Sequence, residues 1–181
     1  MLVFVAAMWL IELVDLVATG LQLDVHGIKP RTIGGLDGIL WAPFLHRGFG
    51  HLAANTLPLV VLGGFVLVRG RRQWLTITAL IVLLAGLATW AFARSAIHIG
   101  ASVLVFGYAG FLVAIGIVER SVVGALTGIL VVVLFGGTLA IGVLPVQRGI
   151  SWEGHIFGLL AGVVVAFAIG ERRKRNETVE S

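Results

Sequence analysis

Six apolar stretches, each about as long as a membrane-spanning helix, constrain this chain more than any other feature of its sequence. A helix needs about 20 mostly apolar residues to cross the hydrocarbon core of a bilayer. The candidate spans are Leu2–Thr19, His51–Val68, Trp74–Phe92, Gly100–Val118, Val122–Leu144 and Trp152–Ile169. The chain is 59% hydrophobic and 12% charged, which is far more apolar than a soluble domain. The sequence therefore predicts an all-α integral membrane protein with a bundle of six transmembrane helices.

One membrane domain accounts for nearly all of the 181 residues. We expect residues 1–170 to form this domain and residues 171–181 to form a basic, disordered cytoplasmic tail. A long polar stretch, Gly20–Gly50, separates the first two spans and contains Pro30 and Pro43. We expect it to fold and to lie partly in the membrane, with its backbone polar groups satisfied by protein contacts, because lipid offers them none.

The distribution of basic residues predicts the orientation of the spans. If the spans alternate in direction, eight of the 13 basic residues fall on one side: Arg69, Arg71, Arg72, Arg120, Arg172, Arg173, Lys174 and Arg175. The remaining five are spread over longer segments on the other side: Lys29, Arg31, Arg47, Arg94 and Arg148. Because the side richer in Lys and Arg faces the cytoplasm, we expect a multi-pass plasma-membrane protein with both termini in the cytoplasm. This pattern explains the net charge of +4 without a nucleic-acid partner.

Four polar residues fall at the same predicted depth, on spans two, four and six. These three spans run from outside to inside, so their first turns all lie in the outer leaflet. His51 and Asn55 are one turn apart and share a helix face, Ser102 begins the fourth span, and His155 begins the sixth. Ionisable residues inside spans are costly and indicate functional sites.

This set of residues suits acyl transfer. A serine becomes nucleophilic when a neighbouring base accepts its proton, and histidine can act as that base. Ser102 is then the nucleophile, His155 the base, and His51 with Asn55 the donors for an oxyanion. Taken singly, each residue is more often a packing contact between helices. A metal site formed by His46, His51 and His155 matches no zinc-binding spacing, so no metal and no cofactor are expected.

The residues around these positions resemble motifs of the rhomboid family of intramembrane serine proteases, of the bacterial type with a six-helix core. His51-Leu52-Ala53-Ala54-Asn55 matches the family's H-x-x-x-N, with His46 five positions earlier. Gly100-Ala101-Ser102 matches its G-x-S, and His155, Gly158 and Gly162 match its H-x-x-G-x-x-x-G. The motifs occur in the family's order on spans two, four and six, and together they cover most of the chain.

The resemblance implies a Ser–His dyad without a third acidic member, so Glu153 is expected to cap or solvate the start of the sixth span. It also implies that Phe106 stacks on His155 and that Gly158 and Gly162 let spans four and six approach closely. Substrates would enter from lipid past the fifth span and the segment Leu144–Ser151. The chain departs from the family at Val103, where a glycine is usual, and lacks the Trp-Arg pair of the first loop.

The sequence thus predicts an endopeptidase that cleaves transmembrane protein substrates near the outer leaflet. Two alternatives remain open at this point. A catalytically inactive rhomboid-like protein would bind membrane proteins without cutting them, and Val103 is the feature that favours it. A small transporter would need polar groups through the full depth of the membrane, whereas the inner halves of spans two, four and six are almost purely apolar. The sequence makes no prediction of oligomeric state.

Overall fold

The computed structural model describes residues 1–18, 21–146 and 149–180, with side chains described as far as residue 171. Its α-helices are α1 (Leu2–Val17), α2 (Gly38–Trp41), α3 (Phe49–Leu67), α4 (Arg71–Phe92), α5 (Ser102–Val118), α6 (Val122–Gly142) and α7 (Trp152–Glu180). The described residues contain no β-strand, only a single backbone bridge between Ile28 and His98. The prediction of an all-α protein is therefore confirmed.

Four of these helices are long and apolar enough to cross a membrane, namely α3, α4, α6 and the Trp152–Glu171 part of α7. The helix α5 is equally apolar but has only 17 residues. Leucine and valine side chains cover the outside of the bundle, and on α6 Val123 and Val133 are each 75% exposed. Such a surface is stable only in lipid, so the protein is a multi-pass membrane protein, as predicted.

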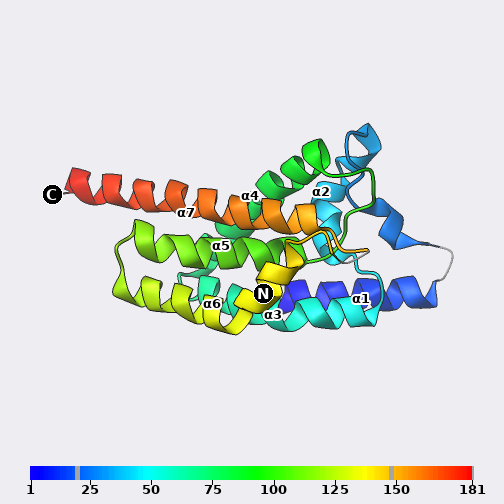
Figure 1. Cartoon of the computed structure of the whole chain (residues 1–181), viewed down its shortest axis with the longest axis horizontal. Helices are drawn as coiled ribbons and strands as arrows, with labels where there is room; N and C mark the ends of the chain where they lie inside the picture. Colours follow the sequence, from blue (N-terminus) through cyan, green and yellow to red (C-terminus); the bar gives the residue numbers. More distant parts are fainter. Residues whose placement is uncertain (19–20, 147–148, 181) are drawn as a thin grey trace.

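The helix α5 is the centre of the bundle and contacts α3, α4, α6 and α7 (Figure 1). Most of its side chains are buried, including Tyr108 and Phe111. At the end of α5 opposite Ser102, the Glu119 carboxylate pairs with Arg69 at 2.5 Å, and the Arg69 guanidinium lies 5.6 Å from the centre of the Phe111 ring. These contacts fasten α5 to the turn between α3 and α4.

Glycines on both helices allow α5 and α7 to pack backbone against backbone. A Cβ atom on Gly158 would lie 2.5 Å from the Val103 carbonyl oxygen. A Cβ on Gly162 would overlap the Gly107 carbonyl oxygen and lie 2.8 Å from the Phe111 nitrogen. The close approach expected from Gly158 and Gly162 is therefore observed, and it sets the spacing between the helices that carry Ser102 and His155.

Residues 21–48, between α1 and α3, are folded, and their short helices contact α4, α1 and α5. It contains short 3₁₀ turns at Leu23–His26, Ile33–Gly35 and Ala42–Phe44 in addition to α2. Ile28 and His98 exchange backbone hydrogen bonds of 3.0 Å in both directions. The Arg31 guanidinium donates to the Ala93 carbonyl at 2.7 Å. These contacts hold the segment that leads from α4 to Ser102.

Several predicted boundaries differ from the observed ones. The helix α5 begins at Ser102 rather than Gly100, because Gly100 has a φ of +115° that a helix cannot accommodate. The backbone of α7 continues past residue 170 to Glu180. The side chains of 172–180 lie outside the described residues, as do Thr19, Arg148 and Ser181. The expected disorder of the tail stays a prediction.

Candidate active site

A cavity of about 610 Å³ lies where α3, α5 and α7 begin. Ser102, His51, Asn55 and His155 all line it, so the structure brings together the four residues that the sequence placed at one depth. They come from three helices, and Ser102 lies 47 positions after Asn55 and 53 positions before His155. The rest of the lining is mostly apolar and includes Pro58, Ile97, Val105, Phe106, Ile141 and Ile150. A large apolar cavity with a few convergent polar groups is the usual form of a binding site.

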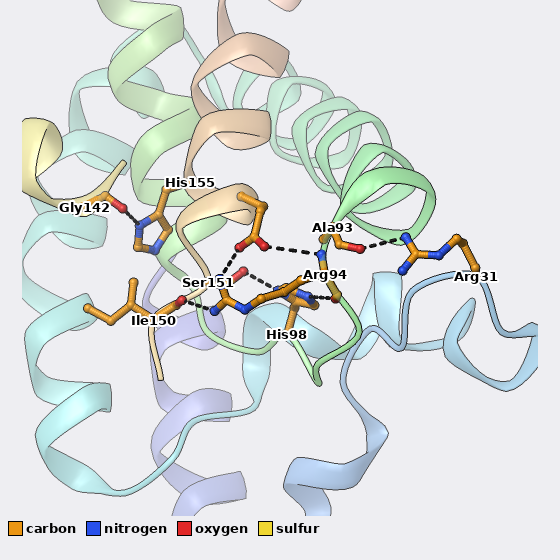
Figure 2. Close-up of polar contacts among 9 residues, drawn as sticks. Arg31, Ala93, Arg94, His98, Gly142, Ile150, Ser151 and His155 are labelled. Atoms are coloured by element: carbon orange, nitrogen blue, oxygen red, sulfur yellow. Dashed lines mark hydrogen bonds and ion pairs between the residues drawn. The ribbon is translucent and has the colours of Figure 1, made fainter. Parts of the chain in front are cut away.

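The His155 ring is held on two sides. Its Nδ1 atom lies 2.7 Å from the Gly142 carbonyl oxygen at the end of α6 (Figure 2). A carbonyl can only accept, so Nδ1 carries the proton and Nε2 of the neutral ring keeps a free lone pair. Phe106 stacks on the same ring, with centroids 4.1 Å apart and planes 6° apart. The ring is therefore oriented with a proton acceptor available at Nε2.

Gly100 brings the backbone before Ser102 against His51 and Asn55. A Cβ on Gly100 would lie 3.0 Å from His51 Nε2 and 3.6 Å from Asn55 Nδ2, and its φ of +115° also requires glycine. The Arg47 N–H donates to His51 Nδ1 at 3.4 Å, so the neutral His51 ring carries its proton on Nε2. Asn55 Nδ2 uses one N–H on the His51 carbonyl at 3.1 Å and keeps a second.

His46 supports the same backbone from the other side. Its Nε2 atom accepts the Ala101 N–H at 3.2 Å, and its Nδ1 atom lies 3.3 Å from the Phe44 carbonyl. Burial, and to a smaller extent the nearby His51, lower the pKa of His46 to about 4. His46 is therefore neutral at pH 7, and its Nε2 can accept the N–H of the residue that precedes Ser102.

The lowered pKa of His46 predicts that acid destabilises this end of the protein. Between pH 6.5 and 4 the unfolded chain protonates His46 and the folded protein does not, so the free energy of unfolding falls as the pH falls. A difference of this size corresponds to about 3 kcal/mol at most. Reversible unfolding in mixed micelles, measured between pH 6.5 and 4, should show a free energy of unfolding that falls more steeply in the wild type than in His46→Gln. The glutamine keeps a hydrogen-bond acceptor that does not titrate. Identical slopes would contradict the assignment.

The structure shows a hydrogen bond between Ser151 and His98, but none between Ser102 and His155, although all four are among the described residues. The His98 Nε2 atom donates to the Arg94 carbonyl at 3.1 Å, so its Nδ1 accepts from the Ser151 hydroxyl at 2.6 Å. Both serines line the cavity. Hydrogen bonds between catalytic groups are often long before substrate binds. Ser102 differs from Ser151 in facing the His51 and Asn55 donors across Gly100.

The contacts that surround Glu153 differ from those expected from the sequence. The expectation that Glu153 caps or solvates the start of α7 is wrong. Its carboxylate accepts hydrogen bonds from Arg94, in the segment between α4 and α5. Arg94 Nη1 donates to Glu153 Oε2 at 2.8 Å, and Glu153 is buried. Val103 lines a second, much smaller cavity next to Ser102 rather than the large one.

No group of three or more His, Asp or Glu residues in the described part of the chain is arranged to hold a metal ion. The chain has no cysteine. The chemistry that the lining residues themselves supply is a hydroxyl, two imidazoles with opposite tautomers and an amide. This set can transfer a proton and stabilise a negatively charged oxygen.

The residues that line the cavity lie within a region that matches a known protein family. The family model described as the Rhomboid domain matches residues 35–172, which include every residue discussed for the cavity. Uncharacterised proteins of Mycobacterium tuberculosis and Mycobacterium bovis are 40% identical to the chain over 185 residues, covering 96% of this chain and 76% of each relative. An uncharacterised protein of Mycobacterium leprae is 37% identical, covering 96% of this chain and 72% of the relative.

Proposed function

The chain belongs to the rhomboid family, and we propose that it is an intramembrane serine endopeptidase acting through a Ser102–His155 dyad. The observation that carries the proposal is the shared cavity: the hydroxyl, the oriented His155 ring and the two donors beside Gly100 all face it. His155 Nε2 accepts the proton of Ser102 as its oxygen attacks the scissile carbonyl. The same nitrogen then protonates the leaving amine, and a water molecule releases the acyl-enzyme.

The negative charge that develops on the substrate oxygen needs donors in fixed positions. His51 Nε2–H and the second N–H of Asn55 are the side-chain donors closest to the Gly100 backbone. As the first residue of α5, Ser102 also has an N–H that no carbonyl of its own helix accepts. These three groups form the proposed oxyanion hole.

Asn55→Ala is expected to lower the rate of acylation by about 10²-fold to 10³-fold, with little change in KM, because the lost donor acts mainly in the transition state. Steady-state kinetics on a transmembrane reporter would measure both constants. Thr76→Ala is a matched control, since Thr76 also bonds the carbonyl four residues earlier but lies on the exposed surface of α4. A change confined to KM, or an equal loss of rate in Thr76→Ala, would contradict the oxyanion role of Asn55.

Six transmembrane helices, formed by α1 and α3 to α7, are the proposed core in the membrane. In this arrangement the basic turns and both termini face the cytoplasm of a cell whose plasma membrane holds the protein. The cavity then opens toward the outer leaflet, and the segment between α1 and α3 lies partly in that leaflet. The apolar exterior and the clustering of arginine support this arrangement.

Substrate helices are proposed to enter from lipid beside α6. Thr138, Ile141 and Gly142 of α6 line the cavity. Of the four long apolar helices, α6 is the least buried, with only 11% of its apolar stretch inside the protein. A helical backbone has its carbonyls bonded internally, so substrates with small or helix-breaking residues near the scissile bond are expected to be preferred.

The test is hydrolysis of a single-span reporter in liposomes that contain the purified protein. Cleavage near the outer end of the reporter span, mapped by mass spectrometry and lost in Ser102→Ala, is the expected result. Cleavage that persists in Ser102→Ala would contradict the proposed nucleophile. Stable binding of the reporter without cleavage would instead identify an inactive rhomboid-like binder.

A further inference from the structure

A set of polar contacts joins the segment that leads to Ser102 with the segment that leads to His155. On one side are Arg94 and His98, between α4 and α5; on the other are Ile150 and Ser151, just before α7 (Figure 2). Glu153, in the first turn of α7, belongs to the second side. Arg94 donates from Nη1 to Glu153 Oε2 at 2.8 Å and from Nη2 to the Ile150 carbonyl at 2.6 Å. Its backbone N–H also donates to Glu153 Oε1 at 3.3 Å. We refer to these five residues as the Arg94 clamp.

We propose that Arg94 is a positioning residue that sets the spacing of the catalytic dyad through this clamp. The inference rests on the proposed function, because it concerns the geometry of the same two residues. Ser102 follows Arg94 by eight positions, along a segment fixed to the first loop by the Ile28–His98 bridge and by Gly100 N–H donating to the Ala42 carbonyl at 2.8 Å. Arg94 is therefore part of the short, anchored segment that leads into Ser102.

The other side of the clamp lies next to His155, the proposed base, along the chain. Glu153 precedes His155 by two positions within the first turn of α7. The His155 N–H donates to the Ser151 carbonyl at 3.1 Å, and the Ser151 hydroxyl is held by His98. The Glu153 side chain is only 7% exposed, so its charge needs the Arg94 partner. Loosening the clamp therefore frees the turn that carries His155.

A second ion pair in the same protein separates positioning from general stabilisation. Arg69 and Glu119 form a comparable partly buried pair at the end of α5 opposite Ser102. If ion pairs matter here only for stability, neutralising either arginine should have the same kind of effect. If Arg94 positions the dyad, only its replacement should change the rate of the chemical step.

The experiment compares Arg94→Gln with Arg69→Gln in acylation by a fluorophosphonate, separating the maximal rate constant kinact from the half-saturating concentration KI. Misplacing reacting groups by about 1 Å can cost about 10²-fold in rate. We therefore expect kinact to fall about 10-fold to 100-fold in Arg94→Gln, with KI changed less than about threefold. Arg69→Gln should lower the Tm and leave kinact within about twofold.

Two further variants sharpen the comparison. Arg94→Lys keeps one charged donor but loses the fork that reaches both Glu153 and Ile150, so it should recover only part of kinact. Combining Arg94→Gln with Glu153→Gln should cost no more than the worse single change, because both remove the same contact. If Arg94→Gln does not fold, Ser151→Ala, which removes only the His98 contact, should still reduce kinact by about threefold to tenfold.

A readout independent of activity distinguishes failure of this proposal from failure of the proposed function. Since the chain has no cysteine, a nitroxide can be placed on Ile150→Cys alone. The electron paramagnetic resonance spectrum of the nitroxide should show greater mobility of the label in Arg94→Gln and no change in Arg69→Gln. If the wild type is not acylated, the proposed function fails and the nitroxide decides on the clamp. Unchanged mobility, or unchanged kinact in an Arg94→Gln protein that is acylated, would overturn the proposal.

Discussion

Ser102→Ala and His155→Ala are each expected to lower the rate of reporter hydrolysis by at least about 10³-fold, the largest effect on activity predicted for any substitution. Removing one member of a catalytic unit abolishes most of the unit's contribution to the rate. The double variant should therefore be no slower than the worse single variant. The rate of product formation in liposomes measures this directly. Both side chains line the cavity at helix starts, so the variants are expected to fold.

Ser151→Ala is the matched control for Ser102→Ala. Both serines line the cavity, and Ser151 is the one whose hydroxyl contacts a histidine in the structure. Because Ser151 belongs to the Arg94 clamp, its replacement should lower the rate of reporter hydrolysis by less than about tenfold. A loss in Ser151→Ala equal to that expected for Ser102→Ala, with Ser102→Ala nearly unaffected, would transfer the nucleophile to the Ser151–His98 pair.

Gly162→Val is expected to have the largest effect on stability. A Cβ at residue 162 would overlap the Gly107 carbonyl, a backbone atom that cannot rotate away. Overpacking typically costs about 1–3 kcal/mol, and a valine against backbone belongs at or above the upper end of that range. Unfolding in mixed micelles should show a loss of about 3 kcal/mol or more, together with loss of acylation, because α5 and α7 carry Ser102 and His155.

The control for Gly162→Val is Gly137→Val on α6. Gly137 is exposed, and an added Cβ there would meet nothing within 4 Å. This variant should keep its stability within about 1 kcal/mol of the wild type. Equal losses at the two positions would show that glycine content itself, rather than the contact between α5 and α7, limits stability.

The sequence predicted the grouping of the site residues well, because helix direction and depth follow from hydropathy and charge alone. Spans that run the same way place His51, Ser102 and His155 at one level before any contact is known. The stacking of Phe106 on His155 followed from the family resemblance and is present. The close approach at Gly158 and Gly162 is present for the same steric reason that the resemblance gave.

What the sequence could not predict are the contacts made by backbone atoms and by residues in irregular segments. The Gly142 carbonyl that orients His155 has no side-chain signature, since every residue carries the same group. Arg94 and Glu153 are 59 positions apart, and their pairing depends on how two loops meet. The one signal in the sequence was an acid two positions before His155; its burial, which makes a cation partner necessary, is seen only in the structure. His46 matched a family position, but only its bond to Ala101 shows what it supports.

The proposed mechanism depends most on which serine is the nucleophile, and covalent labelling identifies that serine directly. Purified wild-type protein in liposomes would be treated with a fluorophosphonate, digested, and the modified peptide sequenced by mass spectrometry. A single adduct on Ser102, absent from His155→Ala protein, is the expected result. An adduct on Ser151, or no adduct in protein whose thermal unfolding shows that it is folded, would contradict it.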